Sequence, residues 1–124
     1  MILVDSSVWI DFFHGKTTAT SLGLLVETEK VLLHPWILGE LMVGHLGKPR
    51  QNRLNDLGLL PKAAIHSIEV LKDFVEQEKL FGLGFSLVDI QLVYSSLLED
   101  AFIWTFDRKL DLLAKHYKKA YSAL

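Results

Sequence analysis

Two short apolar runs, one near each end of the chain, each lead into an aspartate. Residues 2–4 precede Asp5, and residues 102–106 precede Asp107. Each run is rich in β-branched or aromatic residues and stops where a helical pattern begins, so each predicts a buried strand that feeds a helix. Ligands bind beyond the carboxyl ends of the strands of an open parallel sheet. Two carboxylates at that edge repel each other unless a cation lies between them, which suggests a metal site and phosphate chemistry.

Glu40 is the acid whose position is hardest to explain by local structure. It lies inside an apolar segment, residues 36–43, that follows Pro35, and proline suits the first turn of a helix. A position within the helix offers no capping role, and burying a carboxylate among apolar side chains is costly. We therefore expect Glu40 to be paired or bound to a metal.

Helix capping is the alternative role for the other acids. Asp5 and Asp107 each stand before an expected helix and could serve as its N-cap. Asp89 follows Ser86 by three residues, which is the spacing of a capping box, and here capping is the favoured interpretation. Capping leaves Glu40 unexplained.

All four acids could converge on one edge of the sheet. A ligand set made of carboxylates alone is typical of Mg²⁺ or Mn²⁺, which bind through a few carboxylates, waters and substrate phosphates. Asp111 could assist a second metal, although a solvated position is favoured for it. Zinc is disfavoured, because the chain has no cysteine and its five histidines show no ligand spacing.

The composition predicts a single domain over residues 1–124. Half of the residues are hydrophobic and the mean hydropathy is +0.27, yet no uncharged stretch approaches the ~20 apolar residues of a membrane span. No signal peptide is recognisable, and the lack of cysteine favours a cytoplasmic protein. The apolar excess suggests that a partner or a second copy covers part of the surface, so we expect a homodimer.

The net charge of −2 is not that of a typical nucleic-acid binder, but the basic residues are unevenly distributed. Lys48, Arg50 and Arg53 stand together with no acid among them, and Arg108 begins a second basic group that extends to residue 119. For the first group, contact with phosphate and simple solvation are about equally supported. For the second group, a solvated helix face is favoured.

Strands that alternate with longer helices predict an α/β fold with a central, mostly parallel sheet of four to five strands and helices on both faces. The expected strands are 1–5, 30–34, 63–65 and 102–106, with an edge strand at 119–122. The expected helices are about 7–14, 19–28, 35–46, 67–79, 87–99 and 108–117, with a short helix that follows the basic segment 47–53.

Five segments, in this order along the chain, resemble the PIN domain of VapC-type toxins. They are the start MILVDSSVWIDFF, the helix with Pro35, Gly39-Glu40-Leu41 and Gly44, the turn Leu59-Leu60-Pro61, the helix start with Gly84, Ser86 and Asp89, and the junction Trp104-Thr105-Phe106-Asp107 with Leu110. The resemblance extends from residue 1 to about residue 115, and it is weakest over residues 45–80.

The resemblance implies a PIN-like three-layer α/β/α fold and a Mg²⁺-dependent endoribonuclease, with Mn²⁺ as a substitute, that acts as the toxin of a type II toxin–antitoxin pair. Its implied partners are an RNA substrate, which the basic residues named above would contact, and a VapB-type antitoxin. Ser7 and Thr105 match small hydroxyl residues that orient the metal ligands or the attacking water. The implied catalytic and metal-binding acids are Asp5, Glu40, Asp89 and Asp107.

Two other classes of function compete with this interpretation. A phosphotransfer domain would share an aspartate at a strand end. The haloacid-dehalogenase type needs a second aspartate where Ser7 stands, and receiver domains pair acids before the phospho-acceptor strand, so neither pattern is present. A scaffold protein would explain the apolar excess, with the acids reduced to helix caps, but it would leave Glu40 unexplained.

Overall fold

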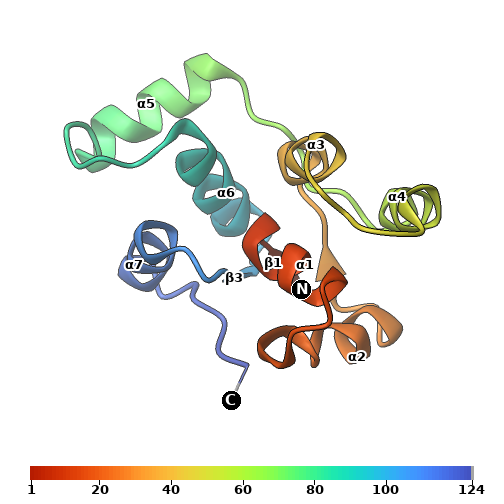
Figure 1. The fold of residues 1–124 in the computed structure, drawn as a ribbon. Coiled ribbons are helices and arrows are strands. Elements are labelled where there is room, and N and C mark those ends of the chain that lie inside the picture. Colours follow the sequence, from red (N-terminus) through yellow and green to blue (C-terminus); the bar gives the residue numbers. More distant parts are fainter. Residues whose placement is uncertain (124) are drawn as a thin grey trace.

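A computed structural model describes residues 1–123 (Figure 1). Short strands alternate with longer helices, as the sequence pattern predicts. In chain order the elements are β1 (Ile2–Val4), α1 (Ser6–Phe13), the 3₁₀ helix η1 (Thr17–Ala19), α2 (Leu22–Glu27), β2 (Val31–Leu32), α3 (Pro35–Val43), α4 (Arg50–Gly58), α5 (Ile68–Glu78), α6 (Leu87–Leu98), β3 (Phe102–Trp104) and α7 (Arg108–His116).

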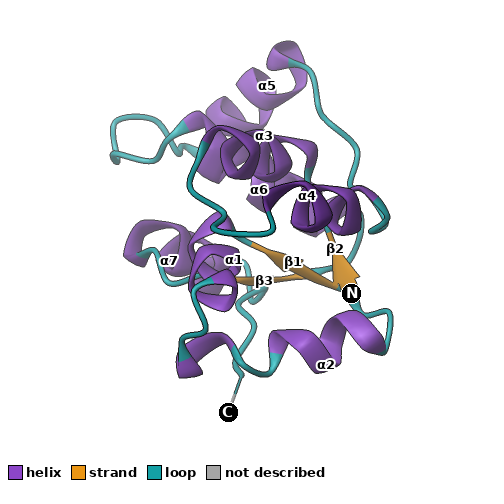
Figure 2. Ribbon diagram, turned by 45° about the vertical axis from the view of Figure 1, so that its right-hand side comes forward, coloured by secondary structure: helices purple, strands orange, loops and turns teal. Residues whose placement is uncertain are grey.

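The sheet is parallel, with the strand order β2-β1-β3. Leu3 pairs with Leu32 on one side and with Ile103 on the other, so the first strand of the chain is the central one. Helices lie on both sides of the sheet, with α2 on one side and α3, α4 and α6 on the other (Figure 2). The α/β class is therefore confirmed.

The predicted number of strands is wrong. Within residues 1–123 the sheet has three strands, and the expected strands at 63–65 and 119–122 each reduce to a single parallel bridge, Leu33 with Lys62 and Ile103 with Ala120. Ala63 N–H still donates to the Leu33 carbonyl at 2.9 Å, but from Ala64 onward the backbone is bound by side chains of α6, beginning with Ser95 Oγ, which donates to the Ala64 carbonyl at 3.4 Å. The Gln91 side chain accepts from His66 N–H at 2.9 Å and donates to the His66 carbonyl at 3.1 Å. Side-chain hydrogen bonds thus replace the strand pairing that the apolar pattern suggests.

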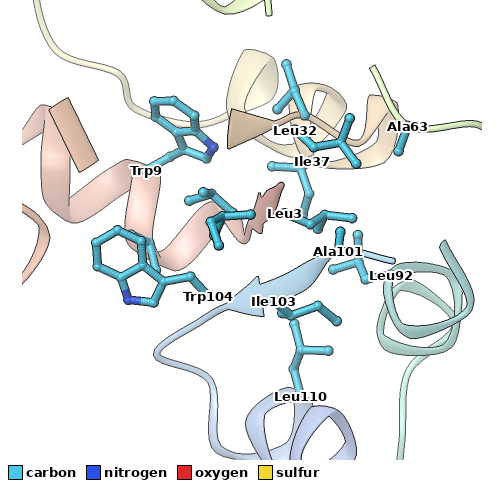
Figure 3. Close-up of a cluster of buried hydrophobic side chains, with 14 of the residues drawn as sticks. Leu3, Trp9, Leu32, Ile37, Ala63, Leu92, Ala101, Ile103, Trp104 and Leu110 are labelled. Carbon is cyan, nitrogen blue, oxygen red and sulfur yellow. The ribbon is translucent and has the colours of Figure 1, made fainter. Parts of the chain in front are cut away.

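The hydrophobic core surrounds the central strand. Leu3 and Val4 are fully buried, which explains why this strand is apolar throughout instead of alternating with polar residues. Figure 3 shows Ile37 of α3 and Leu92 of α6 packed near Leu3, with Ile103 and Leu110 below them.

No helix within residues 1–123 has the length and apolar character needed to cross a membrane.

His34 links the end of β2 to the start of α3. It is fully buried, and its Nδ1 accepts a hydrogen bond from Trp36 N–H at 3.0 Å, so it caps the helix. Burial lowers the pKa of His34 from 6.5 to about 4, the Gln91 side chain partly opposes the shift, and the positive charge of His66 adds to it. The folded protein therefore holds His34 neutral, with Nδ1 available as an acceptor.

The His34 pKa predicts a loss of stability in acid. Between pH 6.5 and about 4 the unfolded chain binds a proton at His34 that the folded chain does not, so the free energy of unfolding falls as the pH falls. The contribution of this residue is roughly 3 kcal/mol over that window. Denaturant unfolding at pH 7 and pH 4.5 measures it. His34→Asn keeps a capping acceptor and should flatten the pH dependence, whereas exposed His14→Asn should not. Equal pH dependence in the two variants would contradict the assignment.

Candidate functional site

Parallel pairing of β1 with β3 brings the ends of these two strands together. Asp5 N–H donates to the Trp104 carbonyl at 2.9 Å, which continues the strand pairing by one residue beyond β1. The Thr105 hydroxyl then donates to Asp5 Oδ2 at 2.7 Å, across 100 positions of sequence. The carboxyl ends of the two strands thus meet at one edge of the sheet, as their parallel arrangement requires.

Asp5 is fixed by two hydroxyl groups. In addition to Thr105, Ser7 Oγ donates to Asp5 Oδ2 at 2.9 Å, and the Asp5 residue is only 7% exposed. The same hydroxyls bind the turn after β3: Ser7 Oγ accepts from Phe106 N–H at 3.0 Å, and Thr105 Oγ1 accepts from Asp107 N–H at 2.9 Å. Ser7 and Thr105 therefore tie the Asp5 carboxylate to the backbone that carries Asp107.

One cavity of about 620 Å³ lies at this edge of the sheet. All four predicted acids line it, although they come from four different parts of the chain. The loop before α6, the first turn of α6 and the first turn of α7 supply its other polar wall. The lining residues are Asp5, Ser6, Ser7, Ile10, Glu40, Gly84, Ser86, Val88, Asp89, Asp107 and Lys109.

Two of these acids also cap helices. Asp89 and Ser86 form a complete capping box at α6, in which Asp89 Oδ2 accepts from Ser86 N–H at 3.0 Å and Ser86 Oγ accepts from Asp89 N–H at 3.1 Å. Asp107 Oδ2 accepts from Leu110 N–H at 2.9 Å. Each cap uses Oδ2, and within residues 1–123 no hydrogen bond engages Oδ1 of either carboxylate. Capping therefore leaves one oxygen of each acid for a ligand.

The expectation that Glu40 is buried among apolar side chains is wrong. The helix α3 buries Ile37 and Leu41, and Glu40 falls on its exposed side, facing the cavity. Partial desolvation of the carboxyl group raises the pKa of Glu40, and the negative charges of Asp5 and then Asp89 raise it further, while the Ser6 hydroxyl opposes the shift. The carboxylates thus repel one another across the cavity, as the sequence argument for an intervening cation assumes.

The donor set fits Mg²⁺ in its chemistry, because the cavity offers carboxylate and hydroxyl oxygens, which hard divalent cations prefer. The spacing is wider than a metal centre requires. In the described part of the chain no group of three or more histidine, aspartate or glutamate side chains lies close enough to hold an ion. Binding would therefore require the carboxylates of Glu40, Asp89 or Asp107 to move toward Asp5.

The four candidate RNA-binding residues lie outside this cavity. Arg50 donates to the Gly44 carbonyl at 3.2 Å and to the Met42 carbonyl, at the end of α3. Arg53 donates to the Leu46 carbonyl, and its guanidinium lies 5.0 Å from the centre of the Phe13 ring. Both arginines hold the α3–α4 connection in place.

The other two candidates, Lys48 and Arg108, are exposed, and Arg108 lies at the start of α7. The basic residue that does line the cavity is Lys109, which in the sequence is only one member of the basic group 108–119. The sequence feature that could have identified Lys109 is its position two residues after Asp107, which places it in the first turn of the helix that Asp107 caps.

Comparison of the chain with models of known protein families gave no match, and comparison with curated proteins gave no significant match.

The hydrogen bonds from the Ser7 and Thr105 hydroxyls to Asp5 should contribute to the free energy of unfolding. Thr105→Val keeps the shape of the side chain but removes the donor to Asp5 and the acceptor for Asp107 N–H. Because both groups would stay in partly buried surroundings, we expect the free energy of unfolding to fall by about 1–3 kcal/mol. Thr105→Ser retains the hydroxyl and is the matched control in a denaturant titration. The bonds contribute nothing if the two variants are equally stable.

Proposed function

We propose that this chain is a Mg²⁺-dependent endoribonuclease that hydrolyses RNA phosphodiester bonds. The observation that carries the proposal is the meeting of four acids from distant parts of the sequence in one cavity at the carboxyl edge of a parallel sheet. Ligands of α/β proteins bind at such an edge. The segments that resemble VapC-type PIN domains supply the same four acids, so the sequence and the cavity support the same assignment.

Asp5 is the best-ordered candidate ligand, because two hydroxyls fix its carboxylate at the base of the site. Asp89 and Asp107 would offer the oxygens that their caps leave unused, and Glu40 would complete the set. When bound, Mg²⁺ would neutralise phosphate charge and activate water. In the hydrolysis the water oxygen would bond to phosphorus as the P–O bond to the leaving oxygen breaks. A carboxylate of the cavity would accept the proton that the water releases, and the leaving oxygen would take up a proton from solvent.

The toxin role and the partners belong to the same proposal. We expect a VapB-type antitoxin, a homodimer and a cytoplasmic location, the last from the absence of cysteine. Large apolar side chains on the surface support the expectation of partners, since Leu24 is 64% exposed, Val43 81% and Leu59 84%. A protein that is monomeric and harmless when expressed alone would contradict this part of the proposal.

The nuclease proposal predicts metal-dependent cleavage of single-stranded RNA. Cleavage should require Mg²⁺ or Mn²⁺ and stop in excess EDTA, because the lining of the cavity offers oxygen ligands and no histidine, cysteine or methionine. Asp107→Asn should lower the rate by at least about 100-fold, since a misplaced ion loses both water activation and charge neutralisation. Asp73→Asn, on the exposed side of α5, is the matched control.

The cleaved ends provide an independent check, because attack by water leaves one hydroxyl end and one phosphate monoester end. End-labelling of the fragments distinguishes these from 2′,3′-cyclic phosphates. Cyclic ends would show that the ribose 2′-hydroxyl attacks in place of water, and cleavage that persists in EDTA would show that the acids do not act through a metal.

Asp89 separates the ligand role from the capping role. Asp89→Ala removes a capping box and should lower the melting temperature without metal, in line with a cost of about 0.5–2 kcal/mol. Asp89→Asn retains an acceptor for Ser86 N–H and removes a charge from a repulsive cluster, so it should melt near the wild-type temperature without metal.

The stabilisation that Mg²⁺ adds should fall in both Asp89 variants, because it grows as RT ln(1 + [L]/Kd) and the ion has lost a ligand. Thermal melts with and without Mg²⁺ measure this difference. Asp89 would be a cap alone if Asp89→Asn kept full metal stabilisation and full cleavage.

A further inference from the structure

Lys109 is the cationic side chain that lines the cavity with the four acids. It lies in the first turn of α7, two residues after Asp107, and α7 packs against α6. Its ammonium group reaches the loop before α6 and donates to the Gly84 carbonyl at 3.1 Å. Among residues 1–123 no carboxylate lies within salt-bridge distance of it, so this lysine is held by a backbone carbonyl and not by the acids beside it.

The loop before α6 leaves room for the ammonium group only because residue 84 is glycine. A Cβ atom at Gly84 would overlap Lys109 Nζ, and the backbone there has φ of +86°, which side-chain-bearing residues rarely adopt. Gly82, two residues earlier, has φ of +71° but no atom within 4 Å of the corresponding Cβ position. The two glycines thus share a backbone requirement, and only Gly84 accommodates the lysine.

The charge balance of the cavity indicates what this lysine does. Four carboxylates repel the phosphates of RNA, and a single divalent cation offsets only part of their charge. An ammonium group has three N–H donors, and the Gly84 carbonyl occupies one of them. The remaining donors lie at the wall of the cavity, where a phosphate oxygen could accept a charge-assisted hydrogen bond.

We propose that Lys109 is a substrate-binding residue that contacts a non-bridging oxygen of the RNA phosphodiester in the acidic cavity, and that the Gly84 carbonyl holds it there. This inference rests on the proposed nuclease function. It assigns to Lys109 and Gly84 a role in placing the phosphate that is separate from binding the metal.

RNA affinity without metal tests the contact directly. The probe is a short fluorescein-labelled oligouridylate, titrated by anisotropy in EDTA at several salt concentrations. Lys109→Gln should weaken binding about 10-fold, since hydrogen bonds to charged groups are the stronger class. It should also reduce the slope of log affinity against log salt by about 0.7, the value for one phosphate contact on a single strand. Lys109→Arg should restore most of both, and exposed Lys72→Gln on α5 should match the wild type.

The glycines test how the lysine is held. Gly84→Ala displaces the ammonium group, whereas Gly82→Ala imposes a similar backbone strain without touching it. Gly84→Ala should therefore weaken oligouridylate binding, and Gly82→Ala should not. In the Lys109→Gln background the effect of Gly84→Ala on binding should largely disappear, because residues that act through one contact are not additive.

The outcomes distinguish this inference from the function on which it rests. If wild-type protein cleaves RNA with Mg²⁺ and Lys109→Gln retains wild-type affinity, salt slope and KM, the lysine proposal is wrong and the nuclease stands. If Lys109→Gln loses affinity but Lys72→Gln loses as much, the effect is general surface charge and the proposal is wrong. If wild-type protein neither binds nor cleaves RNA, both are wrong. If Lys109→Gln raises KM and leaves the stabilisation by Mg²⁺ unchanged, the result supports the lysine proposal.

Discussion

The pairing of β1 with β3 is the constraint on which the candidate site depends. It places residue 5 beside residue 105, and the hydrogen bond from Thr105 to Asp5 at 2.7 Å closes a loop of 100 residues. Because β1 is central and buried on both faces, this edge of the sheet cannot shift without disturbing the core. The buried centre of the sheet therefore carries the buried acid, Asp5, and the more exposed acids come from helix starts and from α3 around it.

The helix caps and the cavity are parts of one arrangement. Asp89 and Asp107 each use one carboxylate oxygen to start a helix, which fixes the side chain and leaves its other oxygen unused. The capping and ligand interpretations that the sequence sets against each other are thus compatible in geometry. An electrostatic cost remains: partial burial raises the pKa of Glu40, and the negative charges of Asp5 and Asp89 raise it further. Lys109 is the cationic side chain that lines the same cavity.

Much of this arrangement could be predicted from the sequence, because it follows from strong local patterns. Apolar runs that end at Asp5 and Asp107 indicate two strands with a common edge, and the spacing of Ser86 and Asp89 indicates the capping box that is present. The strand expected at 63–65 is not formed, since side chains of α6 that are distant in sequence bind this backbone and the residue after it: Ser95 binds the Ala64 carbonyl, and Gln91 binds His66. No local pattern carries that information.

At the site, the surroundings of Glu40 and of Lys109 also depend on contacts between distant parts of the chain. The apolar neighbours of Glu40 suggested burial, but helix α3 buries Ile37 and Leu41 on one side, while Met42 and Val43 next to Glu40 are exposed. The position of Lys109 in the cavity could not be predicted, because its ammonium group is held by the carbonyl of Gly84, which is 25 positions away in the sequence. Contacts of this kind become visible only when the fold is known.

The central claim is that the acidic cavity binds a divalent cation, and anomalous diffraction from crystals soaked in Mn²⁺ tests it most directly. The account predicts a peak inside the cavity, about 2.1 Å from oxygens of Asp5 and of at least two of the other three acids, with their side chains drawn inward. The peak should be absent from crystals of Asp5→Asn. A cavity without a peak at saturating Mn²⁺, with Asp89 and Asp107 still engaged only as helix caps, would contradict it.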